Sequence, residues 1–120
     1  MRFSGVMLGS EDPTALGEFY SRVLGAPGFH EGDWYGWTTG AQLMIGAHSE
    51  VKGKNETPQR IMLTLEVPDV AEAFDELQRH GATVVAKPYR PEDDEEGFWL
   101  ATLADPDGNL VQLATPWSNG

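Results

Sequence analysis

Apolar residues recur with two different periods along the chain, and the same succession of periods occurs twice. They alternate with other residues from Gly5 to Ser10 and again from Met62 to Val67, which predicts a β-strand at the start of each half. After each strand the apolar positions recur every three to four residues, as in an amphipathic helix. Three short strands are expected after each helix. The pattern therefore predicts two consecutive βαβββ modules.

Both expected helices have clear start and stop signals. Asp12, which a proline follows, is a good N-cap, and Asp69 with Glu72 three residues later resembles a capping box. Glycines at Gly25 and Gly81 are the expected stops. The apolar stripes consist of Leu16, Phe19, Tyr20, Val23 and Leu24 in the first helix and Val70, Ala73, Phe74 and Leu77 in the second.

Strand alternation assigns two unlike faces to the predicted sheet, because residues two apart share a side. The face expected to pack under the helices is almost wholly branched aliphatic and consists of Val6, Leu8, Leu43, Ile45, Ile61, Leu63, Leu65, Val67, Val111 and Leu113. The opposite, mixed face consists of Phe3, Gly5, Met7, Gly9, Gln42, Met44, Met62, Thr64, Glu66, Leu110, Gln112 and Ala114. The predicted fold class is α+β: two βαβββ modules form a curled mixed sheet around a cleft, with the helices on its outer face.

The strongest turn signal lies near the C-terminal end. Two apolar runs, Phe98–Ala104 and Leu110–Leu113, flank a short segment that contains Asp107-Gly108, which predicts a β-hairpin. The length of 120 residues predicts one domain, residues 1–120. Within it we expect module one at about 1–50, a linker at about 48–59 and module two at about 60–116.

Net charge and apolar content narrow the classes of molecule that the protein is expected to bind. The net charge of −11 argues against nucleic acids and anionic membranes, which basic patches recognise, and is compatible with a cationic ligand. The acidic run 92–96 is interpreted as a solvated loop, with a rim that steers cations as the alternative. No stretch approaches the roughly 20 apolar residues of a membrane span, and the N-terminal apolar run is too short for a signal peptide. A cytoplasmic location is therefore expected.

The chain lacks cysteine, which excludes disulfides, thiolate zinc sites and a cysteine nucleophile. Any metal site would need His, Asp or Glu. His30 and His80 are interpreted as surface or capping residues. His48 is the exception, because it lies an even number of residues after Met44 and is expected on the same side of the strand. Glu66 is the one carboxylate that alternation places on the mixed face, where it is a candidate general base.

These motifs together resemble the vicinal-oxygen-chelate superfamily, which contains glyoxalase I, fosfomycin-resistance proteins, extradiol dioxygenases and bleomycin-resistance proteins. The resemblance rests on the strand and helix from Gly5 to Gly25, which end in FYSRVLG, on the segment Ile61–Leu77, and on the closing hairpin Asp105–Leu113. It covers nearly the whole chain and implies the fold more specifically than any one activity.

The metalloenzymes of this superfamily hold a divalent ion with residues of the first strand of each module and of the last strands. Matching the motifs puts Gly5 and Met62 at the two first-strand positions, Gln112 at the closing-hairpin position, and Met44 near the fourth. Glycine has no donor atom, a thioether suits soft copper(I), and a neutral amide is a poor donor for hard or borderline ions. We therefore expect no metal and no other cofactor, and the interpretation favours binding over catalysis.

Aromatic and methionine residues are candidates for a binding surface in place of the metal site. Trp side chains offer large flat contacts, and methionines adapt to irregular ligands. Trp117 lies near the C-terminus as a further aromatic residue. The predicted ligand-binding residues are Met7, Trp34, Trp37, Met44, His48, Met62, Glu66, Trp99 and Gln112.

The combination is similar to the bleomycin-resistance branch, whose members are small, acidic, metal-free proteins that bind a toxic natural product between two subunits. This similarity implies a homodimer that sequesters a bulky aromatic ligand and leaves it chemically unchanged. The implied ligand class includes cations. One alternative is a metal-independent isomerase or lyase of small-molecule or natural-product metabolism, with Glu66 or His48 as acid or base. A third class is a protein with no small ligand that acts through its dimer surface.

Overall fold

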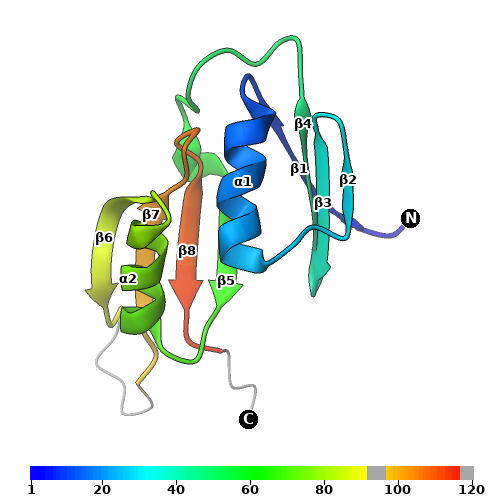
Figure 1. The fold of residues 1–120 in the computed structure, drawn as a ribbon. Helices are drawn as coiled ribbons and strands as arrows, with labels where there is room; N and C mark the ends of the chain where they lie inside the picture. The colour runs from blue at the N-terminus through cyan, green and yellow to red at the C-terminus, as the bar shows by residue number, and fades with distance from the viewer. Residues whose placement is uncertain (92–96, 117–120) are drawn as a thin grey trace. The chain divides into compact units, whose positions relative to one another are not determined.

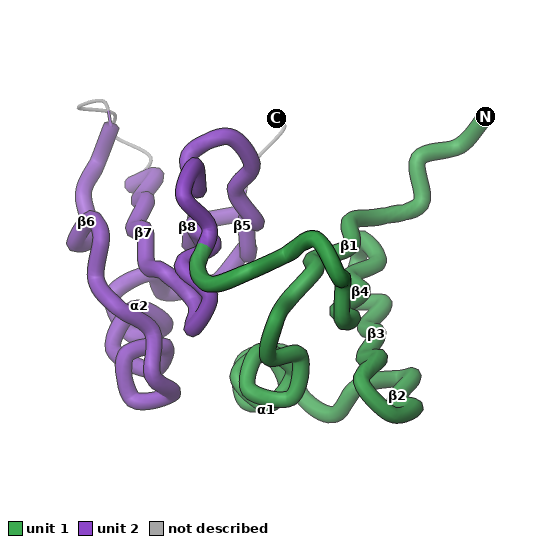
Figure 2. Tube along the Cα trace, turned by 90° about the horizontal axis from the view of Figure 1, so that it is seen from above, with its two compact units in different colours: residues 1–54 green, residues 55–120 purple. Residues whose placement is uncertain are grey.

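The computed structural model describes residues 1–91 and 97–116 of the chain. The acidic run 92–96 and Trp117 lie outside the described residues, so the interpretations attached to them stay predictions. The chain divides into two compact units, which are residues 1–54 and 55–120 (Figure 2). Each unit contains one copy of the repeated module.

Unit 1 (residues 1–54) forms one four-stranded mixed sheet and one helix (Figure 1). Its elements are β1 (Gly5–Ser10), α1 (Pro13–Leu24), β2 (Phe29–Glu31), β3 (Trp34–Thr39) and β4 (Ala41–Ala47). The strand order is β1-β4-β3-β2. β1 pairs parallel to β4, and the remaining pairs are antiparallel.

Unit 2 (residues 55–120) repeats this topology after a short 3-10 helix (Figure 1). Its elements are η1 (Pro58–Arg60), β5 (Met62–Glu66), α2 (Val70–Arg79), β6 (Thr83–Tyr89), β7 (Leu100–Ala104) and β8 (Leu110–Ala114). The strand order is β5-β8-β7-β6, again with the first and last strands parallel. The predicted α+β fold of two βαβββ modules is confirmed, and the strands form one four-stranded mixed sheet in each module.

The two modules match position by position. β1 and β5 begin at Gly5 and Met62, and each begins the same number of residues before its helix N-cap. Met7 pairs with Met44 in unit 1 just as Thr64 pairs with Gln112 in unit 2. Most residues of β1, β4 and β3 therefore have equivalents in β5, β8 and β7, and these positions can be compared directly.

The helix boundaries follow the predicted signals. The carboxylates of Asp12 and Asp69 each accept the backbone N–H three residues on, at 3.1 and 3.0 Å. Gly25 ends α1 with a φ of +92°, whereas α2 ends at Arg79 and reaches Gly81, with a φ of +107°, only after the C-cap residue. Within the described residues, neither helix is long and apolar enough to cross a bilayer.

Each helix packs on one face of its own sheet and closes a small core. α1 contacts β1, β3 and β4, and α2 contacts β6, β7 and β8 (Figure 2). Leu16, Phe19 and Tyr20 of α1 are fully buried. The inner-strand residues expected under the helices, Leu43, Ile45, Val111 and Leu113, are buried as predicted, and Val6, Leu8, Leu63, Leu65 and Val67 are half-buried.

One of the predicted face assignments is wrong, and two residues of the mixed face are more buried than expected. Ile61, expected under the helices, is 66% exposed because it precedes β5 and lies outside the sheet. Leu110 and Ala114 share the face of Met62, Glu66 and Gln112, as predicted, but they are buried at 7% and 6% exposure.

The predicted closing hairpin is confirmed, and a buried aspartate organises its turn. Asp105 is 4% exposed, and its carboxylate accepts the backbone N–H groups of Asp107 and Asn109, both at 2.9 Å. The end of the linker is tied to this turn, because the backbone N–H of Asn55 donates to the Asp107 carbonyl at 2.8 Å. The Asn55 side-chain amide also donates to Asn109 at 3.0 Å.

Candidate functional site

The face of the unit 1 sheet opposite α1 is here called the open face. The β-ladder places on it residues of all four strands: Gly5, Met7 and Gly9 of β1; Gln42, Met44 and Gly46 of β4; Trp34, Gly36 and Thr38 of β3; and Phe29 of β2. One row across the sheet runs from Met7 through Met44 and Gly36 to Phe29. The structure thus brings Met7 and Met44 together, as strand alternation predicted.

Glycines of the open face provide space for large neighbouring side chains. The six-membered ring of Trp34 occupies the space that a Cβ at Gly46 would need. Likewise, the Met44 sulfur lies 2.7 Å from the position of a Cβ at Gly36. Trp34 remains 40% exposed above its glycine. The result is an aromatic surface supported directly by backbone.

Further exposed apolar groups flank this tryptophan. Met7 and Phe29 are each 47% exposed. His48 follows β4 at the same end of the sheet, with its Cβ 3.1 Å from the position of a Cβ at Gly9. The His48 Nδ1 atom accepts the backbone N–H of Glu50 at 3.1 Å. A neutral His48 ring with this hydrogen bond carries its proton on Nε2.

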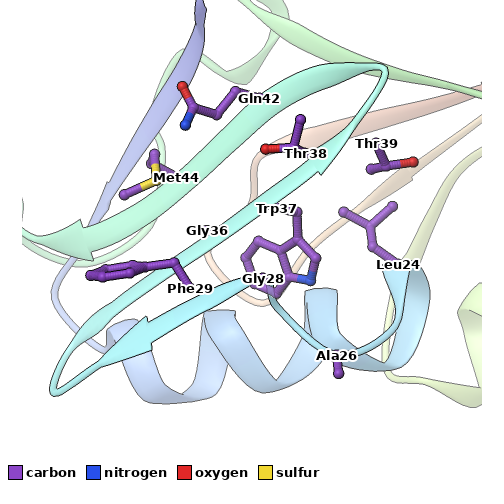
Figure 3. A pocket seen from close by; sticks show the side chains of 10 residues that line it. All are labelled: Leu24, Ala26, Gly28, Phe29, Gly36, Trp37, Thr38, Thr39, Gln42 and Met44. Atoms are coloured by element: carbon purple, nitrogen blue, oxygen red, sulfur yellow. The ribbon is translucent and has the colours of Figure 1, made fainter.

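A hollow of about 370 Å³ lies beside the open face at the outer edge of β3 (Figure 3). It is lined by Leu24, Ala26, Gly28, Phe29, Gly36, Trp37, Thr38, Thr39, Gln42 and Met44. Trp37 is only 3% exposed, and its indole N–H donates to the Gly25 carbonyl at 2.9 Å. Trp37 is therefore chiefly a core residue that offers this hollow an apolar edge.

The equivalent face of unit 2 has a different character. Met62 is 36% exposed at the start of β5, and Glu66 is exposed at its end, opposite Ala114. Between them, the Thr64 hydroxyl donates to the Gln112 side-chain carbonyl at 3.4 Å. Three predicted site residues, Met62, Glu66 and Gln112, thus share one face of the second sheet.

Trp99 lies in a separate place within unit 2. Its backbone N–H donates to the Thr115 hydroxyl at 3.0 Å, and its carbonyl accepts the Thr115 N–H at 3.1 Å. It is 40% exposed and lines a hollow of about 280 Å³ next to the start of α2. The start of α2 lies on the side of the second sheet away from Met62 and Gln112.

The side chains at the metal positions implied by the resemblance do not fit a divalent ion. Gly5 lies against the backbone of Gln42 and offers no donor atom, and the Gln112 carbonyl already accepts a hydrogen bond. Met44 and Met62 bring thioethers, which hard and borderline ions bind poorly. Across residues 1–91 and 97–116, no group of three or more His, Cys, Asp or Glu side chains is arranged to hold a metal ion.

Several residues of this surface were not predicted as site residues. Phe29 and the two glycines beneath Trp34 and Met44 belong to it, as do Thr38 and Gln42 at the hollow. A signal for them exists in the sequence, since glycine recurs on one side of β1, β3 and β4. In a strand interior, glycine often marks a close approach of another group.

A family model described as a glyoxalase-like domain matches residues 5–114. No curated protein matches the chain at a significant level. Among solved structures, a glyoxalase-related enzyme from Fulvimarina pelagi superposes with a TM-score of 0.77 at 21% identity, covering 100% of this chain and 93% of that chain.

Two further structural neighbours bear names that mention bleomycin. A glyoxalase/bleomycin resistance protein from Albidiferax ferrireducens T118 has a TM-score of 0.70 at 26% identity, with 95% of this chain and 98% of that chain covered. A bleomycin-binding protein complexed with bleomycin has a TM-score of 0.63 at 24% identity, with 98% and 100% covered. At such identities the likeness concerns the fold.

Proposed function

Because the chain belongs to the glyoxalase-like domain family of the vicinal-oxygen-chelate superfamily, we propose that it binds and sequesters a bulky aromatic natural product without a metal ion. The family scaffold supports many activities, so the proposal depends on the side chains of this chain. One structural neighbour is a bleomycin-binding protein complexed with bleomycin, which is a precedent for such binding on this fold.

The observation that carries the proposal is the seating of Trp34 over Gly46. A half-exposed indole supported by backbone is a rigid surface on which a flat ligand ring stacks at little cost in side-chain entropy. Met7 and Phe29, each 47% exposed, extend the apolar contact on either side. A flexible thioether next to a rigid aromatic ring suits ligands of irregular outline.

The chemistry of the metal positions supports binding over the metal-dependent reactions of the superfamily. Those reactions need an ion that polarises an oxygen or activates water. Gly5, Met44, Met62 and Gln112 offer poor ligands for such an ion. Stoichiometric binding needs no such ion, because its free energy comes from apolar contact and stacking.

The proposal also specifies the charge of the ligand and the assembly that binds it. A net charge of −11 attracts cationic ligands at long range and repels anionic ones. The resemblance to the bleomycin-resistance branch implies that two copies of the chain pair and hold the ligand between them. We expect sedimentation at the mass of two chains, and a mass of one chain at micromolar concentration would contradict the dimer.

Titration with a panel of aromatic natural products tests the proposal. We expect saturable quenching of tryptophan emission near one ligand per chain by glycopeptide, mitomycin-type or quinone-bearing enediyne drugs, with the ligand recovered unchanged. Conversion of the ligand would favour the isomerase or lyase alternative. No quenching by any of them would contradict the proposal.

A pair of tryptophan variants tests the place of binding. By calorimetry, Trp34→Leu should weaken the affinity about tenfold, or about 1.4 kcal/mol, because the stacking surface is lost. Trp99→Leu is the matched variant, since Trp99 is also 40% exposed. Its affinity shows whether Trp99 takes part as the sequence predicted. An unchanged affinity of Trp34→Leu would contradict binding on the open face.

A further inference from the structure

The hollow of unit 1 faces the edge of a strand. Four of its lining residues, Gly36 to Thr39, are consecutive in β3 (Figure 3). Successive side chains of a strand point to opposite faces, so a hollow on either face would touch only every second residue. Contact with four in a row means that the hollow lies against the backbone edge of β3.

This part of the edge has no neighbouring strand. β2 pairs with β3 only as far as Phe29 opposite Gly36, whereas β3 continues with β4 to Thr39 opposite Ala41. In residues 1–91 and 97–116, no other strand pairs with this side of β3. The loop before β2 is held instead to the core, because the Gly25 carbonyl accepts the Trp37 indole N–H.

The chemistry of the lining defines the class of occupant. None of the ten lining side chains is charged. Phe29, Met44 and Leu24 supply apolar contact, and hydroxyl and amide groups come from Thr38, Thr39 and Gln42. A charged group would lose its hydration here without gaining a partner, whereas amide groups can pair with the strand edge.

We infer that this hollow binds an extended, uncharged peptide-like chain, which pairs with the outer edge of β3 as an added strand. At about 3.3 Å per residue, Gly36 to Thr39 span roughly 10 Å, enough for about three residues of such a chain. This site goes beyond the proposed function, since it requires neither an aromatic ligand nor Trp34.

The test uses acetyl-Val-Ala-Val-amide, which has no charge and no aromatic ring, with the full ¹⁵N-labelled chain. We expect shifted resonances and slowed amide exchange within Trp37–Thr39 at millimolar peptide. The edge strand β6 is the internal control, since its pairing with β7 is irregular and it contains Pro88. Equal protection along β6 would show unspecific pairing and overturn the proposal.

A blocking variant and its matched control make the test specific. A Cβ at Gly28 would have only the Gly36 carbonyl oxygen nearby, at 4.0 Å, so Gly28→Val adds bulk at the hollow without a clash. We expect it to weaken peptide binding at least tenfold. Ala47→Val adds a larger side chain at the exposed far end of β4 and should leave binding unchanged.

Three results would overturn the proposal. They are no protection of Trp37–Thr39 at 10 mM peptide, wild-type affinity of Gly28→Val, and protection that rises with protein concentration without peptide, which would identify a second copy as the occupant. The peptide carries no aromatic group, and its binding is measured through the backbone amide resonances of the protein. Its result therefore stands apart from the outcome of the drug titration.

Discussion

The two modules share one topology but differ in the size of the side chains on the sheet face opposite their helix, which is the open face of unit 1 and the face of Met62 and Gln112 in unit 2. Unit 1 has glycine at four positions of this face, and the equivalent residues of unit 2 are Met62, Glu66, Thr102 and Ala114. Conversely, Trp34 and Phe29 of unit 1 correspond to Leu100 and Ala86 of unit 2. The first sheet thus combines bare backbone with a few large side chains, whereas the second is covered evenly by small and medium ones.

The same exchange of size occurs on the helix side. In unit 1, Gly17 of α1 lies against the ring of Tyr35 of β3, with a Cβ position 2.6 Å from ring atoms. The equivalent residues of unit 2 are Phe74 of α2 and Ala101 of β7. The aromatic ring comes from the sheet in one module and from the helix in the other. A fixed volume between helix and sheet can be filled from either side.

The largest expected effect on stability comes from removing the Phe74 ring of unit 2. Phe74→Ala should lower the free energy of unfolding by about 3–5 kcal/mol, because Phe74 is 7% exposed and Ala101, the equivalent of Tyr35, is too small to replace its ring. Urea denaturation measures it. The double variant with Ala101→Tyr imitates unit 1 and should lose less than the two single variants summed. Additive losses would contradict the exchange of volumes.

A smaller loss is expected from Gly17→Ala in unit 1. Alanine favours a helix over glycine by about 0.8–1.0 kcal/mol, yet here we expect destabilisation by about 1–3 kcal/mol. The Tyr35 ring has little room to retreat, since it stacks on His30 with ring centres 4.0 Å apart. Thermal and urea unfolding measure the change, with the exposed Glu18→Ala as the control. A gain in stability would contradict the close packing.

The smallest expected effect tests where the modules are alike. Asp12→Ala and Asp69→Ala should each cost about 1 kcal/mol, because each removes the oxygen that accepts a backbone N–H at the start of its helix. Asn at either position keeps that oxygen and should be nearly neutral. Urea denaturation that gave costs differing by more than 1 kcal/mol would show that the two helix starts are not equivalent.

Strand alternation predicted which residues share the face of the candidate site, but not the shape of that face. Alternation placed Met7 and Met44 on one face, and the structure pairs them directly. It could not show that Trp34 rests on Gly46, because that contact depends on the register of β3 against β4. Trp34 and Trp37 are three positions apart in β3 and so lie on opposite faces, but only the structure shows that Trp37 is in the core and Trp34 at the surface. A tryptophan's exposure depends on which side of its strand meets the helix.

Local chemistry determined the repeat, both helix starts and the closing turn, since each depends on residues within a few positions of one another. The caps at Asp12 and Asp69 and the turn around Asp105 are of this kind. The packing of the folded chain decided the rest. The hollow at the edge of β3 exists because β2 stops short, and only the folded chain shows that Leu110 of the mixed face is buried. Such features depend on residues distant in the chain, whose proximity only pairing and packing establish.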